Sequence, residues 1–331
     1  MTAKLRDVAE HAGVSVRTVS NVVNGFAHVA PATRQRVQAS IDALGYRPNL
    51  AARTLRRGRT GLLALVVPEV DSPYFADLAA RTVRAAQARG LTVLVEQTDG
   101  DADREKRLLH GDRAHLVDGV LFSPWATTPA DLAARTDTTP LVLLGEHDGT
   151  PGVDHVAIDN VAAAREATAH LLAAGRTRVA AVGVQPHSRN ATARQRLTGY
   201  RAALTAAGLP TDPALEVPVH RLHRADGHQA MHTLLDSPDP PDAVFCFTDE
   251  LALGALRAAG ERGVPVPTAL ALVGFDDIED GRYSTPALTT VSPDKDRIAD
   301  LALDHLAHQA STPGPPRSTT APHRLLVRET T

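Results

Sequence analysis

The chain has 331 residues, a formal net charge of −3 and one cysteine. A length above roughly 250 to 300 residues predicts two or three domains, and a single cysteine excludes an internal disulfide and indicates a reducing compartment. The sequence has neither the ~20-residue apolar run of a membrane span nor a signal-peptide pattern, so we expect a cytoplasmic protein.

Positive charge is concentrated near the N-terminus. Residues 1–60 hold ten Lys or Arg against three acidic residues, a net charge of +7, which leaves −10 for residues 61–331. A basic segment on an acidic body suits nucleic acid, because neutralised phosphates release their counterions. A solvated basic face is the alternative.

Residues 5–24 are predicted to form two short helices around a tight turn. The first helix has an apolar stripe at three- and four-residue steps, at Leu5, Val8, Ala9 and Ala12. Gly13 interrupts the pattern, and Ser15 can cap a second helix. In that helix the inward residues are Val19, Val22 and Val23, and the outer ones are Val16, Arg17, Ser20 and Asn21. This is typical of a helix-turn-helix, whose second helix enters the major groove of DNA.

A third helix is predicted over residues 32–44, ending at Gly45. We therefore expect a DNA-binding domain at 1–48. Residues 49–60 follow as a hinge helix or linker, in which 50–57 could form two helical turns. A helix of that length does not persist alone in water, so it needs a partner or a surface.

From Leu62 onward, short apolar runs alternate with amphipathic helical patterns. The predicted strands are 62–68, 91–97, 118–124, 140–145, 178–184, 243–247 and 270–277, and the predicted helices are 75–89, 103–116, 161–174, 191–207, 226–235, 249–262 and 293–309. This alternation predicts an α/β body with doubly wound parallel sheets and about ten strands. The pattern restarts after Asn160, which favours two lobes with a cleft between them.

Ordered motifs along almost the whole chain resemble the LacI/GalR family of bacterial transcriptional repressors. They are LRDVAEHAGVSVRTVSNVVNG and TRQRVQASIDALGYRPNLAARTL near the N-terminus, then SPYF (72–75), DGVLFSP (118–124), VAIDN (156–160), ATARQRLTGY (191–200), AVFCFTDELALGAL (243–256), VGFDD (273–277), TPALTTV (285–291) and LLVRETT (325–331).

The resemblance implies a homodimer on a near-palindromic operator, associated with the nucleoid. The body, 61–331, is then a two-lobed effector-binding and dimerisation domain similar to periplasmic binding proteins. Lobe 1 takes about 61–158 and 291–323, and lobe 2 about 159–290 and 324–331. A small molecule, with a sugar or sugar derivative as the leading class and a purine or nucleoside as the alternative, would control operator affinity allosterically. The chain lacks a leucine-heptad tail, which favours a dimer over a tetramer.

The same resemblance assigns the DNA contacts. The residues that read bases are Val16, Arg17 and Asn21, and those at phosphates are Ser15, Thr18, Asn24, His28 and Thr33. Helix capping is the alternative role for Ser15 and Thr18. In the hinge, Leu55 corresponds to a leucine that wedges into the minor groove, with Arg53 and Arg56 beside it.

In the cleft, the positions that match effector contacts are Tyr74, Phe75, Ser123, Thr192, Arg196, Leu222, Glu250 and Asp276. An Arg and an Asp facing each other beside an aromatic ring suit a polyhydroxylated ligand. Two positions differ from many relatives, since Leu222 replaces an aromatic residue and Gly145 replaces an Asp. Asp249 is expected to cap a helix instead of contacting the ligand.

Other classes of function have weaker support. The chain has no nucleophile elbow, zinc-protease pair, P-loop or dinucleotide fingerprint at a strand-to-helix junction, so we expect no enzyme and no cofactor. Cys246, inside an apolar strand, is predicted to be a core thiol. The pair His228 and His232 has ligand spacing, but no carboxylate cluster adjoins it in sequence, so we expect no metal site. A solute-binding protein would not need the basic helical head, and a DNA-architectural protein would not need the body.

Overall fold

A computed structural model describes residues 3–23, 26, 28–46, 59–111, 116–145, 152–186, 191–312 and 314–331. The chain divides into two compact units, Met1–Gly61 and Leu62–Thr331. We refer to them as the head and the body. Of the expected hinge at 49–60, all but residues 59 and 60 lie outside the described ranges.

Among the described residues of the head are three helices, α1 (Leu5–Ala12), α2 (Val16–Val23) and α3 (Pro31–Ala43). Gly13 makes the turn between α1 and α2 with a φ of 61°, a left-handed conformation that glycine adopts without strain. Ser15 Oγ accepts a hydrogen bond from the backbone N–H of Thr18 at 3.1 Å and so caps α2. The small core is formed by the buried side chains of Val8, Ala9, Ala12, Val19, Val22, Val37 and Tyr46.

The first sheet of the body, sheet A, has six strands in the order β11-β5-β4-β3-β1-β2. Their bounds are β1 Leu62–Val67, β2 Thr92–Gln97, β3 Gly119–Phe122, β4 Leu141–Leu144, β5 Asp154–Ile158 and β11 Ser318–Ala321. Neighbouring strands are parallel. One face packs against α5 (Pro73–Ala88) and α13 (Lys295–Ser311), and the other against α6 (Ala102–Leu109) and α7 (Pro129–Ala133). Buried strands covered on both faces explain the unbroken apolar runs.

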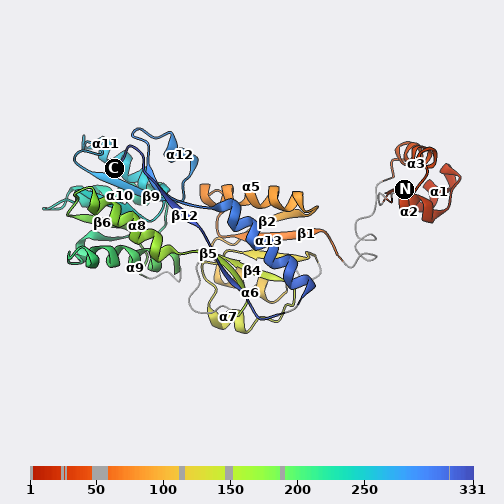
Figure 1. Ribbon diagram of the computed structural model, residues 1–331, viewed down its shortest axis with the longest axis horizontal. Helices are drawn as coiled ribbons and strands as arrows, with labels where there is room; N and C mark the ends of the chain where they lie inside the picture. The colour runs from red at the N-terminus through yellow and green to blue at the C-terminus, as the bar shows by residue number, and fades with distance from the viewer. Residues whose placement is uncertain are drawn as a thin grey trace. The chain divides into compact units, whose positions relative to one another are not determined.

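The second sheet, sheet B, has the order β12-β10-β9-β8-β6-β7, with parallel neighbours except for β10 and β12, which are antiparallel. Its strands are β6 Val179–Val184, β7 Glu216–Pro218, β8 Ala243–Cys246, β9 Ala271–Phe275, β10 Thr289–Pro293 and β12 His323–Leu326. Its helices are α8 Asn160–Ala173, α9 Ala191–Ala206, α10 Arg224–Leu235, α11 Asp249–Glu261 and α12 Glu279–Arg282, with a short 3-10 turn at Pro213–Leu215. Helices α8 and α9 lie on one side of the sheet and α10 and α11 on the other (Figure 1).

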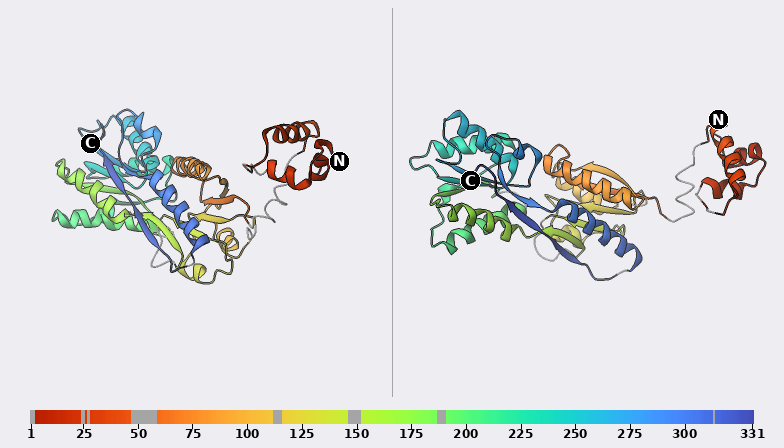
Figure 2. Two further views of the ribbon diagram at one scale, coloured as in Figure 1. Left: turned by 45° about the vertical axis from the view of Figure 1, so that its right-hand side comes forward. Right: turned by 45° about the horizontal axis from the view of Figure 1, so that its top comes forward.

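The chain passes between the two sheets three times, at Asp159, Asp294 and Pro322. Asp159 and Asp294 each cap the helix that follows, because their carboxylates accept hydrogen bonds from Ala162 N and Arg297 N. The third crossing is the β11–β12 segment near the C-terminus, which is drawn in dark blue (Figure 2). Each lobe therefore combines segments that are far apart in the sequence.

The predicted fold class is confirmed, with a few elements that the sequence pattern did not mark. Twelve strands are present among the described residues, against about ten expected. Strand β7 has only three residues, and β10 is rich in Thr and Ser although all five of its residues are buried. No apolar run marks either strand. Among the helices of the described ranges, none combines the length and apolar character that crossing a membrane requires.

Candidate functional site

Helix α2 presents a surface that suits DNA reading. Val16 is 42% exposed, Arg17 is also exposed, and Asn21 is half-buried on the same helix. Ser15 and Thr18 hydrogen-bond to each other through their hydroxyls at 2.9 Å, so both already take part in capping. His28 is exposed and Thr33 is half-buried. The remaining expected DNA contacts, Asn24, Arg53, Leu55 and Arg56, lie outside the described residues.

In the body, a pocket is lined by residues of both lobes. It contains about 970 Å³ of empty space, part of it open to solvent. The structure brings all eight residues expected at an effector site to this pocket: Tyr74, Phe75, Ser123, Thr192, Arg196, Leu222, Glu250 and Asp276. Several of them follow the carboxyl ends of parallel strands, where ligands of open α/β sheets bind.

Arg196 is held rigidly at the wall of the pocket. Its Nε donates to Asn160 Oδ1 at 2.7 Å, and its Nη1 donates to the carbonyl oxygen of Phe247. The guanidinium lies 3.4 Å from the centroid of the Phe275 ring, a cation–π arrangement. Arg196 Nη2 is 3.7 Å from Asp276 Oδ1, and both residues are only 6% exposed. Arg196 is therefore a buried residue of the pocket wall.

The loop after β9 places Asp276 in the pocket. Asp276 and Asp277 have positive φ values of 112° and 49°, which is uncommon for residues other than glycine. The loop is fixed from two sides, since Ile278 N donates to Asp249 Oδ2 at 2.9 Å and Arg328 Nη2 donates to Asp277 Oδ1 at 2.6 Å. Backbone strain of this kind persists where the surroundings enforce it, and it is common at ligand sites.

Asp249 supports this loop and does not cap a helix. The cap of α11 is Thr248, whose hydroxyl accepts from Leu251 N, so the expected capping role of Asp249 is wrong. The Asp249 carboxyl is completely buried and also accepts from Thr290 Oγ1 at 2.6 Å. Burial raises the pKa of Asp249 well above its usual value, and the charge of Asp276 raises it further.

Aromatic rings form a second wall of the pocket. Tyr74 and Phe75 pack edge to face with centroids 5.1 Å apart, and Phe75 meets Trp125 at 6.1 Å. Trp125, the only tryptophan of the chain, was not among the predicted site residues. Its position follows directly after the SP of the DGVLFSP motif, which is the signal that could have indicated it.

Glu105 holds the Trp125 loop in place. This carboxylate is 0% exposed, and it accepts hydrogen bonds from the backbone N–H groups of Trp125, Ala126 and Thr127 at 2.9, 2.9 and 2.7 Å. The Thr127 hydroxyl donates to it as well, at 2.8 Å. A buried carboxylate with this many hydrogen-bond donors is fully satisfied, so Glu105 fixes the backbone of the Trp125 loop.

Polar groups from both lobes meet at another part of the pocket. Glu69, just after β1, and His223, just before α10, are joined at 2.8 Å between Oε2 and Nε2. Glu250 lies near Arg224, with 3.7 Å between Oε1 and Nε. Burial raises the pKa of Glu250, although His223 and Arg224 act in the opposite direction. Glu69 and His223 could not be predicted from local patterns, because their contact joins residues 154 positions apart.

The core thiol is where the sequence predicted it. Cys246 is 0% exposed within β8, and burial raises the pKa of its thiol. A buried thiol whose thiolate is this strongly disfavoured is a poor nucleophile.

A helix-turn-helix head, joined to a two-lobed α/β body with a pocket between its lobes, defines a class of DNA-binding regulators that respond to small molecules. Residues 4–49 match the model for bacterial regulatory proteins of the lacI family, and residues 168–331 match the periplasmic binding protein-like domain.

Individual proteins agree with these matches. The ribose operon repressor of Escherichia coli K12 is 33% identical over 313 residues, 94% of each chain. The Lac repressor dimer bound to operator and the anti-inducer ONPF superposes with a TM-score of 0.88 at 27% identity, over 100% of this chain and 99% of that one. A complex of the transcriptional regulator CelR with cellobiose gives a TM-score of 0.72 at 31% identity, over 99% of this chain and 100% of that one.

The chain belongs to the LacI family of bacterial transcriptional regulators. It is accordingly a DNA-binding repressor with an effector domain, and its partners are operator DNA and a small-molecule effector. Membership of this non-enzymatic family also confirms that the protein is not an enzyme. The alternative of a solute-binding protein is wrong, because the head matches the regulators.

Proposed function

We propose that this repressor binds a near-palindromic operator as a homodimer in the cytoplasm, at the nucleoid, and that a sugar or sugar derivative in the pocket controls its operator affinity. The observation that carries the effector class is the pairing of Arg196 and Asp276 beside aromatic rings. Ionic groups bind neighbouring hydroxyls through charge-assisted hydrogen bonds, and an aromatic ring packs on the C–H face of a sugar.

Trp125 supports this assignment, because its ring adds an aromatic surface to a pocket in which the Leu222 position carries an aliphatic side chain. Among the relatives, the ribose operon repressor and the regulator in complex with cellobiose are both named with a sugar. A purine or nucleoside is the second candidate. It is favoured by the flat aromatic wall of Tyr74, Phe75 and Trp125, on which a base can stack.

A binding screen separates the two classes. Because Trp125 is the only tryptophan and lines the pocket, its fluorescence reports ligand binding directly. The full-length protein is titrated with pentoses, hexoses and disaccharides in one series, and with purine bases and nucleosides in another. Saturable changes with sugars alone support the proposal, whereas changes with purines alone assign the second candidate.

Asp276→Asn then tests the site itself. Hydrogen bonds to a charged group contribute about 1.5 to 3 kcal/mol, so we expect the affinity for the sugar found in the screen to fall about 10- to 150-fold. Asn, like Asp, is among the non-glycine residues most often found at positive φ, so we expect the loop to keep its shape. The control is Asp103→Asn, an exposed residue of α6. Equal affinity in both variants would remove Asp276 from the site.

For DNA recognition we propose the roles expected from the sequence. Arg17 reads a guanine edge, with Val16 and Asn21 beside it. The residues that bind phosphates are Ser15, Thr18, Asn24, His28 and Thr33. Leu55 wedges into the minor groove from the hinge, with Arg53 and Arg56 near phosphates. We further propose that effector binding shifts lobe 1 across the dimer and so alters the pairing of the two short hinge helices.

The homodimer is supported by strand β2, which ends the strand order of sheet A. Leu94 is 48% exposed and Val95 is 45% exposed on this strand. An exposed edge strand with large apolar side chains favours pairing with another chain. A second copy of this protein would cover these residues and place two heads on one operator.

A further inference from the structure

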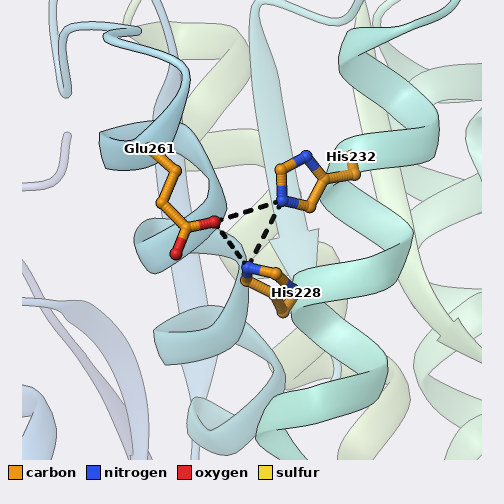
Figure 3. A group of neighbouring side chains, drawn as sticks. All are labelled: His228, His232 and Glu261. Atoms are coloured by element: carbon orange, nitrogen blue, oxygen red, sulfur yellow. Dashed lines mark hydrogen bonds and ion pairs between the residues drawn. The ribbon is translucent and has the colours of Figure 1, made fainter.

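Helices α10 and α11 bring two histidines and a glutamate together on the surface of lobe 2. Figure 3 shows His228 and His232 on α10 facing Glu261 of α11. The two Nε2 atoms are 3.3 Å apart, and Glu261 Oε2 lies 2.8 Å from His228 Nε2 and 3.3 Å from His232 Nε2. Each residue thus directs one possible ligand atom to a common point.

These separations match a tetrahedral metal site. Ligand atoms at about 2.0 to 2.1 Å from a tetrahedral ion lie about 3.3 to 3.4 Å from each other. Two of the three separations already have this value, and the third has to open by about half an ångström. Two imidazoles and one carboxylate form a ligand set that Zn²⁺ accepts, with water at the fourth position. We propose that His228, His232 and Glu261 bind a divalent transition metal ion such as Zn²⁺.

The scaffold around the cluster is rigid enough to hold such a geometry. His228 and His232 are one helical turn apart, so their side chains lie on the same face of α10. The two helices pack so closely that a Cβ atom at Gly254 of α11 would collide with the backbone of Arg224 on α10.

One neighbour opposes metal binding. Arg262 Nε donates to His232 Nδ1 at 3.2 Å, and its guanidinium also pairs with Asp236. With Nδ1 accepting, the proton of a neutral His232 sits on Nε2, the atom that has to bind the metal. The metal-bound form requires the other tautomer, with Nδ1 as donor, so Arg262 has to turn away from the ring. Metal binding and simple hydrogen bonding therefore require different tautomers of His232, and a substitution of Arg262 can tell them apart.

Binding would join α10 and α11 at a point away from the pocket. His223 immediately precedes α10, and Glu250 lies in the first turn of α11. The metal would therefore hold two pocket groups on one rigid pair of helices. The sequence predicted no metal here because the two histidines have no supporting Cys or carboxylate cluster in the sequence. Glu261 is 29 residues beyond His232 and meets it only through the packing of α10 on α11.

The test is Zn²⁺ binding to the full-length, chelator-treated protein, measured by competition with a chromophoric chelator. Because the chain has fifteen histidines, single variants have to identify the site. His228→Ala, His232→Ala and Glu261→Gln should each weaken Zn²⁺ binding at the tightest site by at least about 100-fold. Loss of a residue that only supports a ligand typically weakens metal binding by about 10- to 100-fold, so a larger loss identifies a direct ligand. His308→Ala, an exposed histidine of α13, should bind as the wild type does.

Arg262→Gln provides an independent readout, because a Gln side-chain oxygen can accept the Nδ1 proton of the metal-bound tautomer. We expect this variant to bind Zn²⁺ more tightly than the wild type. Co²⁺ substitution should give the visible absorption of a tetrahedral complex in the wild type and not in His232→Ala. Wild-type affinity in all three ligand variants, or weaker binding in Arg262→Gln, would overturn the proposal.

Discussion

Glu105→Gln is the substitution that most directly tests how the pocket wall is built. The Glu105 carboxylate is 0% exposed, and its two oxygens accept from three backbone N–H groups and one hydroxyl in the Trp125 loop. Glutamine has the same shape but only one accepting oxygen, and its amide nitrogen is a donor. Whichever way the amide is turned, at least one backbone N–H then faces another donor.

The expected loss of stability is about 3 kcal/mol. A buried donor left without an acceptor costs about 1 to 3 kcal/mol. The remaining hydrogen bonds lose their charge assistance, which makes them roughly half as strong. With Glu105 Oε1 accepting from Trp125 N and Oε2 from the following residues, the smallest loss arises when the amide nitrogen faces Trp125.

Urea unfolding of the full-length protein measures this effect, with the fluorescence of Trp125 as the probe of the loop. Glu105→Gln should lower the free energy of unfolding of the body by about 3 kcal/mol and shift the Trp125 emission to the red as the loop loosens. The control is Glu279→Gln, an exposed residue of α12, for which we expect a change within about 0.5 kcal/mol. If both variants unfold at the wild-type midpoint with unshifted emission, the anchoring role of Glu105 is wrong.

Three further predictions concern DNA binding and assembly. Arg17→Ala should reduce discrimination between operator and other DNA by about 1 to 3 kcal/mol while leaving weak, salt-dependent binding, and an unchanged preference in a randomised-duplex selection would contradict base reading. Leu55→Ala should lower operator affinity more than nonspecific affinity in a gel-shift assay, so equal losses would argue against the wedge. Leu94→Glu should place a charge on the edge strand and convert the dimer to a monomer in sedimentation velocity, whereas Leu116→Glu, at a residue that is 58% exposed on the loop before β3, should not. A dimer that persists in Leu94→Glu would relocate the interface.

Local patterns predicted most of the secondary structure, because its rules act over a few residues. The stripe in α1 and the apolar runs of β1 and β8 fall within a residue or two of the expected bounds. The antiparallel pairing of β10 with β12 was not predictable in this way, because it joins Thr290 to Leu326 across 36 positions. The second crossing also comes at Asp294, a few residues after the expected lobe boundary at 291.

The site shows the same distinction between local and distant information. The family resemblance indicated eight positions that the structure brings to one pocket. Seven of them lie in the quoted motifs, which end a strand or begin a helix at that pocket, and Leu222 lies outside the motifs. Trp125, Glu69 and His223 were missed. The position of Trp125 depends on Glu105, twenty residues earlier, and the contact of Glu69 with His223 joins residues of the two lobes that are 154 positions apart. No periodicity within one segment carries that information.

The three crossings limit how the body can deform. Two of them lead at once into capped helices, at Asp159 and Asp294, and Asp294 N also donates to the carbonyl oxygen of Pro322 at 3.0 Å, which ties the second passage to the third. Three short connections, two of them joined by a hydrogen bond, should resist sliding and twisting of the lobes more than bending at these residues. We therefore expect the lobes to move as a hinge with one preferred direction when a ligand binds, with no secondary structure broken.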